Sequence, residues 1–157
     1  MAAYRTSRLS KRRVLVVDDD ETNRDLACHI LQLSQLDVDV APGGEQALAL
    51  FEQARDAGQP YDVVVADLIM PGMSGTDLAA RLVAMPDPPR LVCVTGRVAP
   101  TTLEMCAAAG FDVVVTKPYR MASLLLAVMG TTSTASRFRP AAPMATPSVS
   151  VMHRLPS

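Results

Sequence analysis

Cysteine is scarce in this sequence, and long hydrophobic runs are missing. The three cysteines, Cys28, Cys93 and Cys106, are odd in number, widely spaced and set among apolar neighbours. They argue against a disulfide framework or a cysteine-bound metal, and they indicate small buried side chains in a reducing compartment. No apolar run approaches the roughly 20 residues that span a bilayer, so we expect no membrane association. The basic start also lacks the apolar middle of a secretory signal, which leaves the cytoplasm as the expected location.

Negative charge is missing from both ends of the chain. Residues 1–13 hold five Lys or Arg and residues 131–157 hold three Arg, and neither stretch holds an acid. The rest carries seven basic residues against all 16 acids, a net charge of −9, although the whole chain has a formal charge of −1. An acidic body with basic ends does not fit a nucleic-acid-binding domain. We expect no direct nucleic-acid partner, and we interpret Arg12 and Arg13 as solvated flanking charges.

Five apolar, mostly β-branched runs alternate with five segments of helical period. The runs cover residues 14–17, 38–40, 61–67, 90–95 and 111–116. Three of them are continuous rather than alternating, which indicates strands buried on both faces. The alternation predicts an α/β fold with a doubly wound, five-stranded parallel sheet between two layers of helices. Val38 and Val40 alternate with aspartates, so this short strand is predicted to lie at an edge of the sheet.

The length of 157 residues, 49% of them hydrophobic, suits one compact domain with some additional sequence. We predict a basic flexible segment over residues 1–12, a folded domain over residues 13–130 and a disordered tail over residues 131–157. The tail is rich in Pro, Ser, Thr and Ala and has no periodicity. It is also too short for a helix-turn-helix output module.

Negative charge gathers where the first predicted strand ends, at Asp18 and Asp19. Ionised carboxylates this close together repel one another unless a cation lies among them. In an open parallel sheet, ligands bind outside the carboxyl ends of the strands, where this chain also places Asp67, Thr95 and Lys117. Three carboxylates, a hydroxyl and an ammonium group suit Mg²⁺ together with a phosphoryl group. The pattern therefore predicts phosphoryl transfer onto a carboxylate.

At these residues the chain resembles the receiver domains of two-component response regulators, over about residues 13–129. The matching motifs, in chain order, are "VLVVDDDETNR", "APGGEQAL", "YDVVVADLIMPGMSG", "LVCVTG" and "VVVTKPY". The resemblance implies a flavodoxin-like receiver fold with strand order 2-1-3-4-5 and five helices. It also implies a phosphoacceptor in a two-component phosphorelay rather than an enzyme. The expected partners are a sensor histidine kinase or a histidine phosphotransfer protein and a downstream protein target, with the chain itself a monomer or weak dimer.

The same resemblance implies roles for the acidic residues. Asp67 matches the phosphorylated aspartate, because it precedes the "MPGMSG" loop. Asp18 and Asp19 match the acidic pair that holds Mg²⁺ directly or through water. Asp67 and the main-chain carbonyl of Ile69 complete the implied ligand set for the ion.

Further roles are implied around the phosphoryl group. Thr95 matches the residue whose hydroxyl engages this group, Lys117 matches the lysine that contacts it, and Gly96 leaves space for it. The bond between Lys117 and Pro118 is typically cis in the family. The family often has an aromatic residue that rotates together with the hydroxyl residue, but the corresponding position here is Val114, so a switch through Thr95 and an aromatic ring is in doubt.

Several alternatives stay open from the residues. The chain is a stand-alone receiver, a relay intermediate or a receiver fragment of a hybrid sensor histidine kinase. The stretch "DDDETNR" is closer to the receivers of such hybrids, in which Asn and Arg are common at these positions. A Mg²⁺ phosphatase of the haloacid dehalogenase type is a weaker alternative, since it usually needs a second aspartate where this chain has Ile69. A nucleotide-binding enzyme would need a glycine-rich loop after the first strand. A degenerate receiver used only for binding would normally have lost Asp67, Lys117 or the acidic pair.

Overall fold

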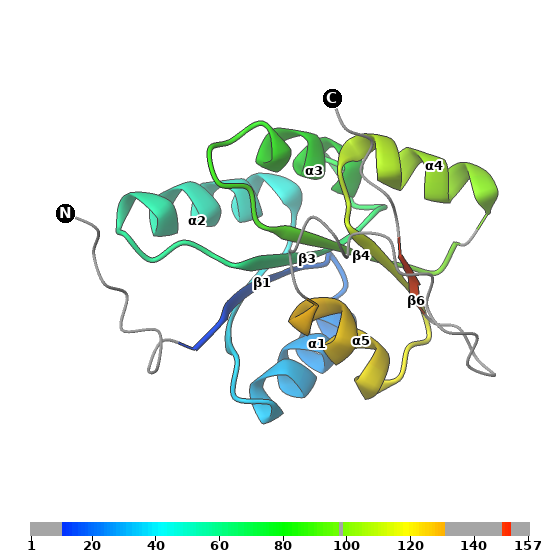
Figure 1. Cartoon of the computed structure of the whole chain (residues 1–157), viewed down its shortest axis with the longest axis horizontal. Helices are drawn as coiled ribbons and strands as arrows, with labels where there is room; N and C mark the ends of the chain where they lie inside the picture. The colour runs from blue at the N-terminus through cyan, green and yellow to red at the C-terminus, as the bar shows by residue number, and fades with distance from the viewer. Residues whose placement is uncertain (1–10, 98, 131–148, 152–157) are drawn as a thin grey trace.

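The computed structural model describes residues 11–97, residues 99–130 and the backbone of residues 149–151. Strands and helices alternate along the chain, as Figure 1 shows. The strands are β1 (Arg13–Val17), β2 (Asp37–Ala41), β3 (Val63–Asp67), β4 (Arg90–Thr95), β5 (Val113–Thr116) and β6 (Val149–Val151). The helices are α1 (Glu21–Leu33), α2 (Gly44–Asp56), α3 (Gly75–Val83), α4 (Pro100–Ala109) and α5 (Met121–Met129).

The strands form one sheet between two layers of helices. Their order is β2-β1-β3-β4-β5-β6, and the first five are parallel. Helices α1 and α5 cover one face, and α2, α3 and α4 cover the other (Figure 1). The predicted order of the five parallel strands is confirmed, and so is the edge position of β2.

The central strands are buried on both faces because their alternate side chains enter two separate apolar clusters. On β1, Leu15 and Val17 pack into the cluster that includes side chains of α2, α3 and α4. Val14 and Val16 point the other way, into the cluster under α1 and α5. All four are at most 2% exposed, which accounts for the continuous apolar run of this strand.

Two of the strands begin later than their apolar runs. The runs predicted from residues 61 and 111 become strands only at Val63 and Val113. An aspartate stops each ladder, since the carboxylate of Asp62 accepts from the Arg13 N–H and that of Asp112 accepts from the Leu91 N–H, both at 2.9 Å. These side chains replace the backbone partner that a further strand residue would offer.

Residues 149–151 lie within the predicted tail and form β6, which adds a sixth, antiparallel strand beside the five predicted parallel strands. A Val-Ser-Val triplet suits a strand, because β-branched side chains favour extended backbone. β5 would otherwise end the sheet with unpaired N–H and C=O groups. Residues 1–10, 131–148 and 152–157, where we also predicted flexible or disordered sequence, lie outside the described residues.

The interpretation of Arg12 and Arg13 as solvated charges is wrong. Arg12 donates to the carbonyl of Val128 at 3.0 Å. Arg13 forms ion pairs with Asp37 at 3.2 Å and Asp39 at 3.0 Å. Its guanidinium carbon also lies 4.5 Å from the centre of the Tyr61 ring. Both arginines therefore tie the start of β1 to distant parts of the fold, which local sequence does not reveal.

Candidate functional site

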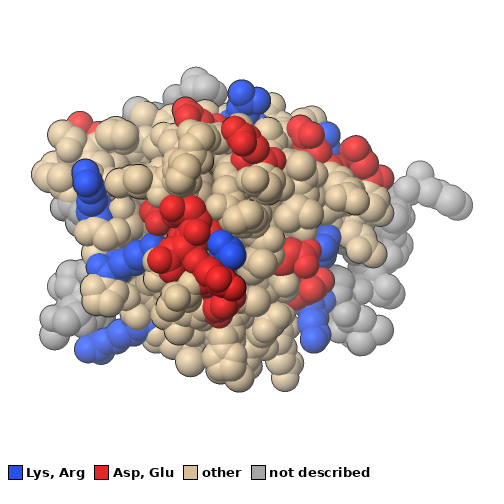
Figure 2. Space-filling model, turned by 180° about the vertical axis from the view of Figure 1, so that it is seen from behind, with Lys and Arg blue, Asp and Glu red and all other residues tan. Residues whose placement is uncertain are grey.

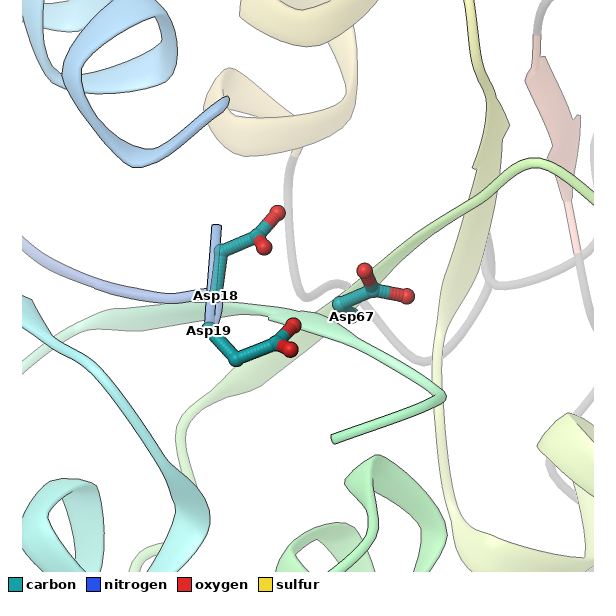
Figure 3. Close-up of side chains that lie close together, drawn as sticks. All are labelled: Asp18, Asp19 and Asp67. Atoms are coloured by element: carbon teal, nitrogen blue, oxygen red, sulfur yellow. The ribbon is translucent and has the colours of Figure 1, made fainter. Parts of the chain in front are cut away.

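Three carboxylates converge at the ends of two neighbouring strands. Asp18 and Asp19 directly follow β1, and Asp67 is the last residue of β3. One oxygen from each lies within 4.8 Å of the others, and Figure 3 shows the three side chains side by side. Asp18 is buried, Asp67 is half-buried and Asp19 is exposed. The cluster is therefore buried on the side of Asp18 and exposed to solvent on the side of Asp19.

The local backbone turns sharply after β1 to start α1. The Asp18 N–H still pairs with the Ala41 carbonyl of β2 at 3.2 Å, while an Asp18 carboxylate oxygen accepts from the Asp20 N–H at 2.9 Å. Asp20 caps α1 by accepting from the Asn23 N–H. The acids in this run consequently have different roles, because Asp20 serves the helix while Asp18 and Asp19 face the site.

Lys117 brings one positive charge into the acidic cluster. Its Nζ donates to Oδ2 of Asp18 and to Oδ2 of Asp67, each at 3.1 Å. Burial by itself would lower the pKa of Lys117, but the hydrogen bonds to Asp67 and Asp18 and their charges outweigh it, so this pKa is raised. The ammonium form is thereby held in place, and the peptide bond from Lys117 to Pro118 is cis, as the resemblance implies.

The carboxyl end of β4 supplies a hydroxyl beside the lysine. Thr95 ends β4 and is 2% exposed, and its carbonyl accepts from the Lys117 N–H at 2.8 Å. Its Oγ1 accepts from the Arg97 N–H at 3.1 Å. Gly96 is exposed, and an added Cβ there would meet nothing within 4 Å. Val114 lies in the middle of β5 with no exposed surface. As a valine, it has no aromatic ring that could rotate together with Thr95.

The segment after Asp67 returns tightly to begin α3. The Ile69 N–H lies 3.4 Å from Oδ1 of Asp67, and the Ile69 side chain is 60% exposed. Gly75 lies so close to this turn that an added Cβ would stand 2.1 Å from the Asp67 carbonyl oxygen. A glycine is required there. Gly75 is the last residue of the "MPGMSG" motif, and this position is the sequence signal for the tight turn.

One face of the molecule carries a cluster of acidic side chains. Figure 2 shows a face on which acidic side chains gather in one central patch, with a basic side chain against it. A patch of one sign attracts counterions and raises their local concentration.

Comparison with known proteins identifies the family. The profile of the response regulator receiver domain matches residues 14–129. The chain belongs to this family. The strand order and the convergence of Asp18, Asp19, Asp67 and Lys117 agree with the resemblance drawn from the five motifs.

In several curated relatives, the region that matches this chain is part of a longer protein. The sensory transduction protein RegX3 of Mycobacterium tuberculosis is 35% identical over 112 residues, which are 71% of this chain and 47% of RegX3. The heme response regulator HssR of Staphylococcus aureus is 34% identical over 114 residues, 73% of this chain and 48% of HssR. The sensory/regulatory protein RpfC of Xanthomonas campestris is 32% identical over 123 residues, 76% of this chain and 16% of RpfC. The chain thus spans about half the length of RegX3 and HssR.

Solved structures show the same fold. The chemotaxis protein CheY4 of Vibrio cholerae has a TM-score of 0.69 and 27% identity, covering 76% of this chain and 98% of CheY4. A CheY-like receiver domain from Methanospirillum hungatei has a TM-score of 0.66 and 27% identity, covering 74% of this chain and 89% of the neighbour. Receiver domains are signalling domains that bind Mg²⁺ at an acidic site and interact with histidine kinases or phosphotransfer proteins. Among the described residues, no helix has the length and apolar composition to cross a membrane.

Proposed function

We propose that this receiver domain is a phosphoacceptor in a two-component phosphorelay and that Asp67 takes the phosphoryl group. The observation that carries the proposal is the Asp67 carboxylate at the end of β3, with the Lys117 ammonium 3.1 Å from it and the Asp18 and Asp19 carboxylates beside it. Asp67 is half-buried, so one side of its carboxylate can meet a donor while the other side is held by the protein.

The transfer needs position and charge neutralisation more than proton chemistry. An Asp67 oxygen attacks phosphorus in a phosphohistidine, the O–P bond forms, and the P–N bond breaks with its electron pair staying on the imidazole of the donor. Lys117 is placed to stabilise negative charge on the phosphoryl oxygens. The Thr95 hydroxyl and the open space at Gly96 lie at the end of β4, next to the start of the Lys117 segment, and we assign them to the remaining oxygens.

The donor set fits a magnesium ion. Carboxylate oxygens are the ligands that Mg²⁺ prefers, and the cluster of three carboxylates has only one ammonium partner in the part of the chain described. We assign Asp18, Asp19, Asp67 and the main-chain carbonyl of Ile69 as ligands. The bound ion would neutralise charge on the phosphoryl group and on the carboxylates that surround it.

The setting of the domain has two candidate forms. A stand-alone receiver agrees with the match to CheY4, which covers 98% of that chain. A receiver of a hybrid sensor kinase agrees with the match to RpfC, which covers 76% of this chain but 16% of that protein. In both settings we assign the role of phosphoryl donor to a histidine kinase or phosphotransfer protein. The downstream target is another protein, and the domain acts in the cytoplasm.

The test is phosphorylation by a small donor. The chain is incubated with Mg²⁺ and acetyl phosphate, and the intact mass is compared for the parent, Asp67→Asn and Asp56→Asn, whose exposed aspartate lies at the end of α2. We expect one phosphoryl group on the parent and on Asp56→Asn and none on Asp67→Asn. Equal labelling of all three proteins would show that the acceptor is another residue.

If the parent gains no mass, the same three proteins are mixed with a phosphorylated histidine phosphotransfer domain. Transfer of phosphate from this donor to the parent, but not to Asp67→Asn, would support Asp67 as the acceptor. It would also show that the protein accepts phosphate from a histidine donor and not from acetyl phosphate. No transfer from either donor, with Mg²⁺ binding intact, would reject the phosphoacceptor role.

A further inference from the structure

Two of the three cysteines meet between the sheet and one helix. Cys93 lies within β4 and Cys106 on α4, and neither has any exposed surface. Their Sγ atoms are 3.8 Å apart, although 13 positions separate the two residues in the sequence. Cys28, the third cysteine, is partly exposed and lies on α1, which covers the opposite face of the sheet (Figure 1). Folding therefore creates a thiol pair in the core and leaves one cysteine apart from it.

Cys106 is the anchor of α4. In the described part of the chain, α4 buries this one residue, whereas each of the other helices buries at least three. Leu103 and Ala107 pack against the same apolar cluster but are only partly buried, and no side chain caps the helix at Ala99. A helix held by few buried side chains opens at a low free-energy cost. Opening of α4 gives a small oxidant access to both sulfur atoms.

The two thiols differ in acidity because they share a hydrogen bond. This bond and burial raise the pKa of the Cys93 thiol above its ordinary value. The same bond lowers the pKa of the Cys106 thiol, against the effect of burial. The thiolate is the form that attacks an oxidant, and a neighbouring thiol can then convert the product to a disulfide. Cys106 therefore suits the attacking role and Cys93 the resolving role.

We propose that Cys93 and Cys106 are a reversible oxidation site, at which a peroxide converts the two thiols to a disulfide that fixes α4 on β4. The Cys106 thiolate attacks one oxygen of hydrogen peroxide, an S–O bond forms, and the O–O bond breaks to release hydroxide. The proton lost by Cys106 converts this hydroxide to water. The Cys93 sulfur then attacks the Cys106 sulfur, the S–S bond forms, and the S–O bond breaks, so that the oxygen leaves with the Cys93 proton as a second water. Two electrons thereby pass from the thiols to one peroxide molecule.

The disulfide would change how α4 is held beside the end of β4. Shortening the Sγ–Sγ distance from 3.8 Å to the roughly 2 Å of a disulfide draws α4 toward the strand. Thr95 is two positions after Cys93, and side chains two positions apart lie on the same face of a strand. The bond therefore fixes α4 against the face of the sheet that carries Thr95. A reducing compartment keeps the pair as thiols until an oxidant arrives, because disulfides there are usually transient.

Peroxide treatment of the folded, full-length chain tests the proposal, with Cys28→Ala as the matched control. The parent, Cys28→Ala, Cys93→Ala and Cys106→Ala are exposed to a small excess of hydrogen peroxide and then unfolded with a maleimide that labels free thiols. Circular dichroism checks that each variant is folded before treatment. We expect the parent and Cys28→Ala to lose the labels on Cys93 and Cys106 together, with the two peptides joined in mass spectrometry until dithiothreitol is added. Cys93→Ala and Cys106→Ala should form no internal disulfide.

Exposure alone predicts the opposite order of reaction. Cys28 is the more exposed thiol, so it would then lose its label while Cys93 and Cys106 keep theirs. That result, or loss of the two labels without joined peptides, would overturn the oxidation site.

Amide hydrogen exchange measures whether the disulfide fixes α4. We expect the amides of residues 103–109 to exchange at least about tenfold more slowly in the oxidised parent than in the reduced parent, with the amides of α1 unchanged. A disulfide without slower exchange in α4 would overturn this part of the proposal. None of these readouts depends on phosphorylation of Asp67, so the proposed function is tested separately.

Discussion

Replacing Lys117 with methionine should make Mg²⁺ bind more tightly while it weakens the ion-free protein. The Lys117 ammonium lies 3.1 Å from oxygens of both Asp18 and Asp67, and we assign these same carboxylates to the metal. A Mg²⁺ ion lies about 2 Å from its ligand oxygens, so an ion bound to the Oδ2 atoms that Lys117 contacts would lie about 5 Å from the ammonium. Lys117 and Mg²⁺ therefore compete for one pair of carboxylates.

The size of the effect follows from Coulomb's law. Charges of +1 and +2 at about 5 Å repel by roughly 1.5 kcal/mol in a water-like dielectric. Removing the ammonium should then tighten Mg²⁺ binding about tenfold. Without Mg²⁺, the loss of two partly buried ion pairs leaves three carboxylates without their cation, and the free energy of unfolding should fall by about 2–3 kcal/mol.

Urea unfolding followed by circular dichroism, at increasing Mg²⁺ concentration, measures both quantities through linkage. Lys11→Met is the matched control, because Lys11 is the other lysine of the chain and is exposed. Saturating Mg²⁺ should stabilise Lys117→Met by about 1.4 kcal/mol more than the parent or Lys11→Met. An equal or smaller gain in Lys117→Met would refute the shared use of these carboxylates.

Three further predictions concern single side chains. Tyr61→Phe removes the hydroxyl that donates to Asp39 at 2.5 Å and should lower the free energy of unfolding by about 1 kcal/mol near neutral pH. Burial and the hydrogen bond to Asp39 raise the pKa of Tyr61 to about 12, so its contribution is complete below about pH 10 and is lost as the pH rises through 12. The difference in tyrosinate absorbance between the parent and the variant should show this titration. Gly75→Ala forces a Cβ to 2.1 Å from the Asp67 carbonyl oxygen and should cost at least about 2 kcal/mol in thermal or urea unfolding, whereas Gly96→Ala, which meets nothing within 4 Å, should stay within about 0.5 kcal/mol of the parent. Ile69→Asn offers a polar group that can orient water near Asp67 where exposed Ile69 offers none, so its acyl phosphate should decay several-fold faster in a mass time course; equal decay would show that residue 69 does not control hydrolysis.

The strand pattern and the acidic strand ends can be predicted because both depend on local sequence. Continuous β-branched runs identify buried strands, and a parallel sheet brings the carboxyl ends of its strands together. These two rules are sufficient to place Asp18, Asp67 and Lys117 at one site. The ion pairs from Lys117 to the two aspartates lie across 99 and 50 residues of sequence, so their geometry follows only from the folded chain.

Other features depend on partners that the sequence does not mark. Val149–Val151 becomes a strand only because β5 offers an open edge, and its surroundings in the sequence have the composition of a disordered segment. The contact of Arg13 with Tyr61 and two aspartates of β2 joins three separate segments. The late starts of β3 and β5 depend on side-chain hydrogen bonds of Asp62 and Asp112, which compete with the ladder.

The hydrogen bond from Arg12 to Val128 bears on where this domain can be cut. Helix α5 has no basic residue in its last turn, and its final carbonyls are bound instead by Arg12 at Val128 and by Arg90 at Ala127. A fragment trimmed to the family match, which starts at residue 14, would lose one of these two anchors, and the end of α5 would fray. A fragment that keeps both anchors of α5 must therefore begin upstream of the homologous region and include Arg12, a residue that alignment alone would discard.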